Sequence, residues 1–212
     1  MRSGTIIVAV VLAVMTLLAL RILVPGESTR PRALAYTPAE EEPVCPWRDP
    51  ETDLRLFFPG ATGHHLEAKS LSAMRPQLTR ILGRQPTGAD HLLRVHRITE
   101  DTNPVGSVLV KRVKGEHGAI ELVIALSADR IVRGVRAQRS REPENISAAL
   151  ATNGWIRAFA GKSLTNELRP GHDLPAPPAK ARATAQAIAE GVRVSLASFA
   201  LADAKDSAHP VH

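Results

Sequence analysis

The chain has 212 residues, 44% of them hydrophobic, which is enough for one domain with a sizeable core and a further segment outside it. A net charge of +6 and a pI near 10.1 would suit binding to nucleic acid, to an anionic membrane or to an acidic protein. Only 3% of the residues are aromatic and the arginines are dispersed among acids, which argues against nucleic-acid binding. A single cysteine, Cys45, excludes an intrachain disulfide, a CxxC redox pair and a cysteine-ligated metal cluster.

A long apolar run follows the first few residues. Thr5 to Leu20 carries no charge, and Ile22 to Val24 extend the run after one arginine. About 20 such residues cross a hydrocarbon core of roughly 30 Å as a helix, and Pro25 would end that helix. We therefore predict an N-terminal tail at residues 1–4 and a transmembrane anchor at residues 5–25. A cleaved signal peptide is the alternative, although the run is long for one, and the basic residues on its two sides leave the orientation open.

The next segment differs sharply in composition. Residues 26–53 are rich in Pro, Glu, Thr and Arg and show little apolar periodicity, which predicts an extended, solvated linker. We expect a single folded domain over residues 54–202 and a disordered tail over residues 203–212.

The first half of the domain predicts a helix and a sheet. Apolar residues recur at helical spacing from Leu71 to Leu82, and Pro76 and Gly83 suit the two ends of a helix within that stretch. Four segments with strand character then follow one another with short turns between them, which predicts an antiparallel meander. These segments are 92–98, 105–113, 119–126 and 131–138.

The second half predicts two helices around a loop. Residues 147–160 suit a helix capped by Ser147, and the Gly/Pro-rich segment 170–178 suits a loop. Residues 180–201 suit an alanine-rich helix whose inward positions are Ile188, Val192, Leu196 and Phe199. The predicted fold class is α+β: a single transmembrane helix, then an antiparallel β-meander packed with helices.

Motifs for catalysis are missing from the sequence. It contains no Ser–His–Asp or Cys–His signature, Walker loop or GxGxxG, and its histidines are too scattered for a motif such as HExxH. We predict no enzymatic activity, no catalytic residue and no metal ligand; a metal or haem role for one histidine is the alternative hypothesis. The arginines at 130, 133, 136, 139 and 141 are spaced mostly by three, which on a regular strand sends successive side chains to opposite faces. We therefore expect a charged strand edge instead of one arginine patch.

Several ordered segments carry a resemblance. They are LFFPGA at 56–61, VKGEHGAIELVIALSADRIVRGV at 113–135, RE at 141–142, AFAGKSL at 158–164, GHDLPA at 171–176 and AIAEGV at 187–192. In this order and spacing they resemble the FMN-binding domain of the Rnf complex G subunit and of the C subunit of sodium-pumping NADH:quinone reductase. That family has one N-terminal membrane helix, an extracytoplasmic domain and FMN esterified to a threonine. The resemblance therefore implies a single-pass protein of the inner membrane with its C-terminal domain in the periplasm.

The chain departs from that family at the flavin-attachment motif, S-G-A-T-x-[ST]-S. Residues 179–185 align there as AKARATA, so Arg182 replaces the acceptor threonine and Lys180 replaces the glycine. An arginine side chain cannot form the phosphoester. Thr184 lies two residues further on, where its hydroxyl would point elsewhere. Lys180 and Arg182 could still hold an FMN phosphate as a charge pair.

Three functional hypotheses follow. The favoured one is a membrane-anchored accessory subunit of a respiratory or photosynthetic electron-transfer complex, which has lost covalent FMN and contacts the other protein subunits. The second is an electron-transfer flavoprotein that binds FMN non-covalently near Lys180, Arg182 and Thr184. The third is a free-standing extracytoplasmic sensor or ligand-binding domain.

Overall fold

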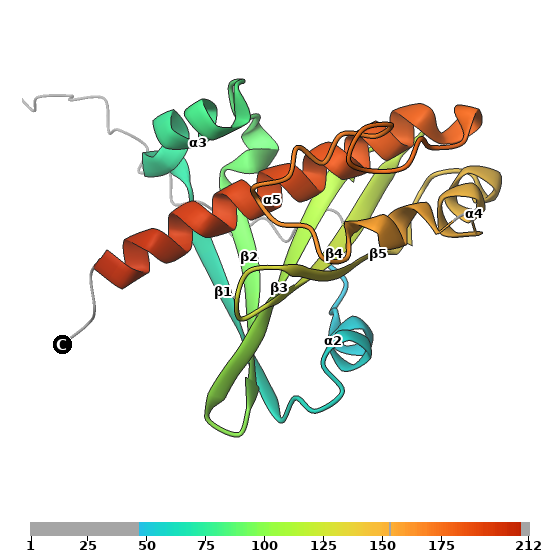
Figure 1. Cartoon of the computed structure of the whole chain (residues 1–212). Coiled ribbons are helices and arrows are strands. Elements are labelled where there is room, and N and C mark those ends of the chain that lie inside the picture. Colours follow the sequence, from blue (N-terminus) through green and yellow to red (C-terminus); the bar gives the residue numbers. More distant parts are fainter. Residues whose placement is uncertain (1–46, 153, 209–212) are drawn as a thin grey trace, which may run out of the picture. The chain divides into compact units, whose positions relative to one another are not determined.

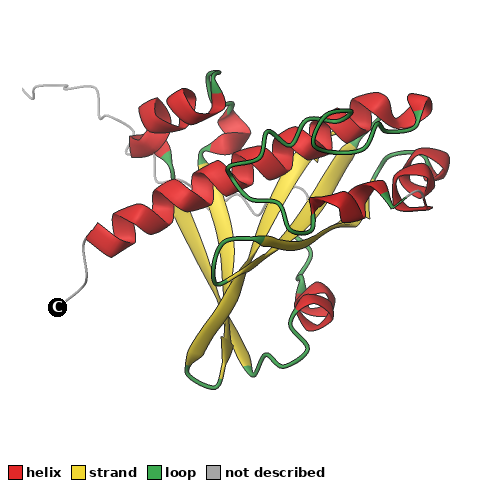
Figure 2. Cartoon of the chain, viewed as in Figure 1, coloured by secondary structure: helices red, strands yellow, loops and turns green. Residues whose placement is uncertain are grey.

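The computed structural model describes residues 47–152 and 154–208, which belong to one compact unit that begins at Trp47. This unit is α+β, as predicted: Figure 2 shows a single layer of strands crossed by helices. Within these residues no helix is both long and apolar enough to cross a membrane. The predicted tail at 1–4, the predicted anchor at 5–25 and most of the predicted linker lie outside the described residues.

The sheet is a five-stranded antiparallel meander in which each strand pairs with the next along the chain. The four predicted strands are confirmed. The first strand was not predicted, because its segment HHLEAKS is mostly polar and exposed and so lacks an apolar face. The strands are β1 (Gly63–Ser70), β2 (Leu92–Glu100), β3 (Asn103–Lys114), β4 (Ala119–Ser127) and β5 (Val132–Ser140).

The helices are α2 (Glu51–Phe57), α3 (Arg75–Leu82), α4 (Glu144–Thr152) and α5 (Arg182–Ala208), with short 3-10 turns η1 (Ser72–Met74), η2 (Gly88–Asp90), η3 (Trp155–Phe159) and η4 (Ala179–Ala181). The prediction of one helix over 147–160 is wrong. Gly154 has a positive φ of 67°, which a right-handed helix cannot contain, so α4 and η3 are separate elements. Helix α4 also begins before Ser147, which is therefore not its cap.

The limits of the folded unit also differ from the predicted 54–202. Helix α2 begins at Glu51, inside the stretch assigned to the linker, and α5 continues to Ala208, inside the stretch assigned to the tail. Apolar periodicity is weak at both ends, since α2 has only about two turns and the last turns of α5 mix apolar and charged residues.

One face of the sheet packs against α5, which crosses the strands in Figure 1. The four inward positions predicted for this helix are all buried. Gly191 allows the close approach, because a Cβ there would lie 2.3 Å from a methyl group of Val113 on β3. The core also contains Trp155 and Phe159 of η3, whose rings meet edge to face at 5.4 Å.

The opposite face of the sheet is covered by the N-terminal segment Trp47–Phe58, which we call the strap. Leu54 and Phe58 of the strap complete a small apolar cluster with strand residues such as Ile98. Around that cluster the contacts are polar and charged. Arg136 of β5 pairs with the buried Asp53 at 2.9 Å, and the guanidinium of Arg112 lies 4.1 Å from the centre of the Trp47 ring.

Two β-bulges in β5 change where its arginines point. The register with β4 shifts between Glu121 and Leu122 and again between Ala125 and Leu126, so β5 carries an extra residue at each place. In a regular strand, successive side chains alternate between the two faces of the sheet. Each extra residue interrupts this alternation, so that two residues three apart on either side of it share a face. Arg133, Arg136 and Arg139 consequently all lie on the strap face, contacting Phe58, Asp53 and Glu121. The prediction that their spacing rules out one patch is wrong.

Candidate functional site

Glu142, in the connection from β5 to α4, joins three segments that are distant in sequence. Its Oε1 accepts hydrogen bonds from the backbone N–H groups of His117 and Gly118 in the β3–β4 turn, both at 2.9 Å. Its Oε2 accepts the hydroxyl of Thr184 in the first turn of α5 at 2.8 Å. Gly115 leaves room for this arrangement, since a Cβ there would lie 2.3 Å from Oε1.

The carboxylate of Glu142 is held in its charged form. Burial raises the pKa of Glu142, but the hydrogen bonds from Thr184, His117 and Gly118 outweigh burial and bring the pKa below its ordinary value. The charge also lies beside the first turn of α5, where the helix dipole favours an anion. This residue therefore fixes the start of α5 against the sheet.

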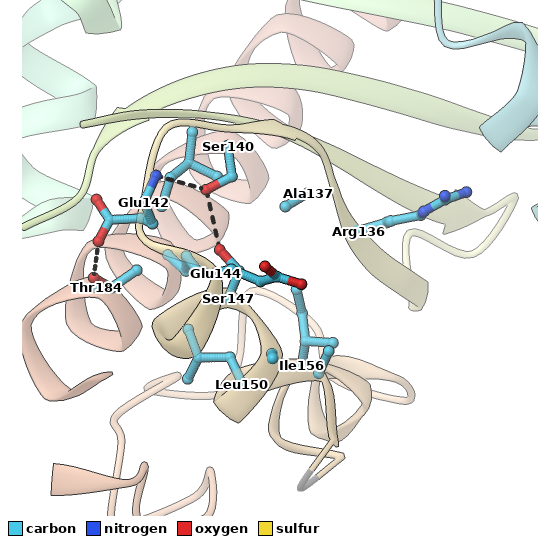
Figure 3. A pocket seen from close by; sticks show the side chains of 13 residues that line it. Arg136, Ala137, Ser140, Glu142, Glu144, Ser147, Leu150, Ile156 and Thr184 are labelled. Carbon is cyan, nitrogen blue, oxygen red and sulfur yellow. Dashed lines mark hydrogen bonds between the residues drawn. The ribbon is translucent and has the colours of Figure 1, made fainter. Parts of the chain in front are cut away.

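A pocket of about 430 Å³ opens next to this junction. Its walls are mostly apolar and come from β4, β5, α4, η3 and α5. Its polar groups include the hydroxyls of Ser140 and Ser147, which lie 3.4 Å apart, and the carboxyl of Glu144. Figure 3 shows Ser140, Glu142, Glu144 and Ser147 gathered on one side, with Leu150 and Ile156 below them. A volume of this size accepts a small organic molecule or several side chains of a partner.

The structure separates the three predicted site residues. Thr184 is buried, with 1% of its surface exposed, and lines the pocket. Lys180 in η4 and Arg182 at the start of α5 are both exposed and do not line the pocket.

The residues at this place do not fit an esterified flavin. The Thr184 hydroxyl already donates to Glu142, and a phosphate placed there would meet the carboxylates of Glu142 and Glu144. Arg136 contributes to the lining, but its guanidinium pairs with Asp53 under the strap, and Figure 3 shows its side chain directed away from Glu142 and Thr184. Within the described residues, the pocket thus combines an apolar wall with negative charge.

A second buried polar group lies beneath the strap. His96 of β2 is 6% exposed, and its Nδ1 has no hydrogen-bond partner in the described part of the chain. Burial, together with the charges of His64 and Arg94 and against the opposing charge of Asp49, lowers the pKa of His96 to about 4. The His64 and His96 rings lie 5.5 Å apart, yet no group of three His, Cys, Asp or Glu residues in the described ranges could hold a metal ion.

Sequence reasoning named Glu142 only as part of the RE dipeptide and gave it no role. The resembling segments 113–135 and 141–142 contain the β3–β4 turn and Glu142, which meet in space at this carboxylate, and Thr184 belongs to the aligned stretch 179–185. No sequence pattern indicated Ser140, Glu144 or the pocket itself, because the proximity of these groups depends on how α4 packs.

Comparisons of the sequence add no relative: no protein-family model matches the chain, and no curated protein matches it.

Proposed function

We propose that this protein is a membrane-anchored accessory subunit of a membrane electron-transfer complex, with a domain similar to the FMN-binding domain but without a covalent flavin. The observation that carries the proposal is the state of Thr184, whose buried hydroxyl is bonded to Glu142 while the aligned acceptor position holds the exposed Arg182. The aligned position therefore offers no hydroxyl for an ester, and the nearest one is buried and bonded to Glu142. The domain then acts by docking to other subunits, with the anchor at 5–25 holding it at the membrane.

The membership in a complex is tested by isolating the chain from its native membranes. A tagged copy, expressed at its natural level and extracted in mild detergent, should migrate in a native gel with partners whose haem, flavin or iron–sulfur absorbance changes on reduction. Migration as a single chain, or a purified complex that contains this chain only in substoichiometric amounts, would remove support for an accessory subunit.

A second candidate, a ligand-binding domain, is favoured by the 430 Å³ pocket with its apolar wall and its hydroxyl and carboxylate groups. A ligand that suits these groups is a small apolar molecule bearing a hydrogen-bond donor or a positive charge near Glu144. Mass spectrometry of an organic extract from the purified chain distinguishes this candidate. A small molecule retained by the wild type and lost from Ala151→Trp, which fills the pocket from α4, would favour it over the accessory subunit.

A further inference from the structure

The strap face of the sheet carries an excess of positive charge at its surface. Five arginines from three strands lie on it, and Arg48 of the strap joins them; the strand residues are Arg94, Arg112, Arg133, Arg136 and Arg139. We call these six side chains the arginine face. The strap adds Arg55, which is largely exposed and pairs with Glu51.

The negative charges on the same face are fewer, and two of them, Glu121 and Asp53, lie deeper. The side chain of Glu121 is only 3% exposed, and it accepts hydrogen bonds from the backbone of Arg48 and from the side chain of Arg112, both at 2.9 Å. Asp53 is similarly buried beneath Arg136, whose own side chain is 49% exposed. Asp49 and Glu51 are the other acids of the strap. Glu121 and Asp53 therefore neutralise arginines from below, while the guanidinium groups of Arg136 and Arg139 remain partly exposed at the surface.

The N-terminal tether joins the folded unit at the strap, on the arginine face. Trp47, where the described unit begins, lies on the arginine face between Arg94 and Arg112. The apolar run ends at Val24, so 22 residues, 25–46, separate it from Trp47. A chain of that length spans at most about 75 Å, and the tether attaches at the arginine face. This argument rests on the proposed anchor, with which a tether of this length allows the arginine face to reach a bilayer.

We infer that the arginine face docks on anionic phospholipid headgroups of the membrane that holds the anchor. Guanidinium groups bind phosphate oxygens through paired N–H donors, and a tryptophan at the edge of such a face suits the headgroup region. The tether keeps the local concentration of the membrane high, so weak contacts suffice. Docking fixes the orientation of the domain relative to the bilayer.

The test uses the full-length chain reconstituted into vesicles of phosphatidylcholine, with or without phosphatidylglycerol, each containing a little headgroup spin-labelled lipid. The spin label quenches tryptophan fluorescence over short distances. The chain has two tryptophans, and Trp155 is buried, so Trp47→Phe reports how much of the quenching belongs to Trp47. We expect quenching of Trp47 in vesicles with phosphatidylglycerol, weak quenching without it, and loss of the difference at high salt.

The variant Arg133→Gln/Arg139→Gln should lower the ratio of docked to undocked domain about 25-fold, about fivefold for each arginine. The matched control is Arg80→Gln/Arg157→Gln, which removes two exposed charges elsewhere and should leave the ratio unchanged. The variant Arg133→Lys/Arg139→Lys keeps the charges and should dock. Its urea unfolding midpoint should be close to that of the wild type, which would show that the strap stays in place.

Equal quenching in both lipid compositions, no quenching in either, or a glutamine variant that docks as well as the wild type would overturn the inference and point to an acidic protein partner. Failure of the anchor is recognised separately. In that case alkaline carbonate strips the chain from vesicles of both compositions before any fluorescence is measured.

Discussion

The two faces of the sheet are stabilised by different forces. The α5 face buries a continuous apolar core that contains the largest fully buried side chains, such as Trp155 and Phe159. The strap face has a much smaller apolar cluster surrounded by ion pairs, arginine–aromatic contacts and the unpartnered nitrogen of His96. We expect the first face to respond mainly to lost volume, and the second to pH and salt. The following changes separate these responses.

The largest effect is expected on the α5 face. Phe159→Ala removes a fully buried ring and its edge-to-face contact with Trp155, which should lower the free energy of unfolding by about 3–5 kcal/mol. Urea titration of the full-length chain in detergent measures the loss. Leu56→Ala is the control, because Leu56 is 59% exposed on the strap and should change the stability by less than about 0.5 kcal/mol. A similar loss in both variants would contradict the assignment of the core to this face.

The junction at Glu142 should come next. Glu142→Ala leaves the Thr184 hydroxyl and two backbone N–H groups without their acceptor, at an expected cost of about 2–4 kcal/mol. Thr184→Val removes only one hydrogen bond and should cost about 1 kcal/mol. In the double variant the two losses should be less than additive, because both include the same bond. Strict additivity in urea titrations would mean that the two side chains do not interact.

The strap face should lose stability in mild acid because of His96. Its folded-state pKa of about 4 lies below the ordinary 6.5, so the unfolded chain binds this proton more readily. The contribution of neutral His96 to the free energy of unfolding is complete above pH 6.5. It is lost as the pH falls toward 4, by at most about 3 kcal/mol. His96→Leu should remove this part of the pH dependence, measured as the difference between urea titrations of the two proteins. Parallel pH profiles for wild type and variant would contradict the burial of a neutral His96.

The smallest effect is expected for the strap contact at Trp47. Trp47→Ala removes the ring between Arg94 and Arg112 and should cost about 1 kcal/mol. Hydrogen exchange should quicken at strap amides such as those of Leu54 and Phe58, which bond to Pro50 and Leu54, while the amides of α5 keep their protection. Faster exchange throughout α5 would show that the two faces are not independent.

The sequence predicted the parts of this fold that have strong periodicity. Strands β2 to β5 and the inward face of α5 were expected from alternating and helical apolar spacing. The polar strand β1 and the short helix α2 have no such spacing, and Gly154 divides a segment whose apolar pattern suits a single helix. The bulges of β5 depend on pairing with β4, which no local pattern in β5 reveals.

The candidate site was predicted only in part for the same reason. A motif alignment predicted three site residues, Thr184, Lys180 and Arg182. Of these, only Thr184 lines the pocket. Glu142 is 42 residues from Thr184, and the bond between them depends on how α5 crosses the sheet. Long-range polar contacts of this kind cannot be deduced from spacing along one chain.

The central claim, that this domain carries no covalent flavin, is tested most directly by a visible absorption spectrum of the full-length protein purified in detergent, followed by acid precipitation. We predict that the acid pellet shows no flavin band. A band in the supernatant would favour flavin held non-covalently near Lys180 and Arg182. A band that stays with the pellet would contradict the account, because it would require a covalent acceptor other than Arg182, and loss of that band in Thr184→Val would identify Thr184 as the acceptor.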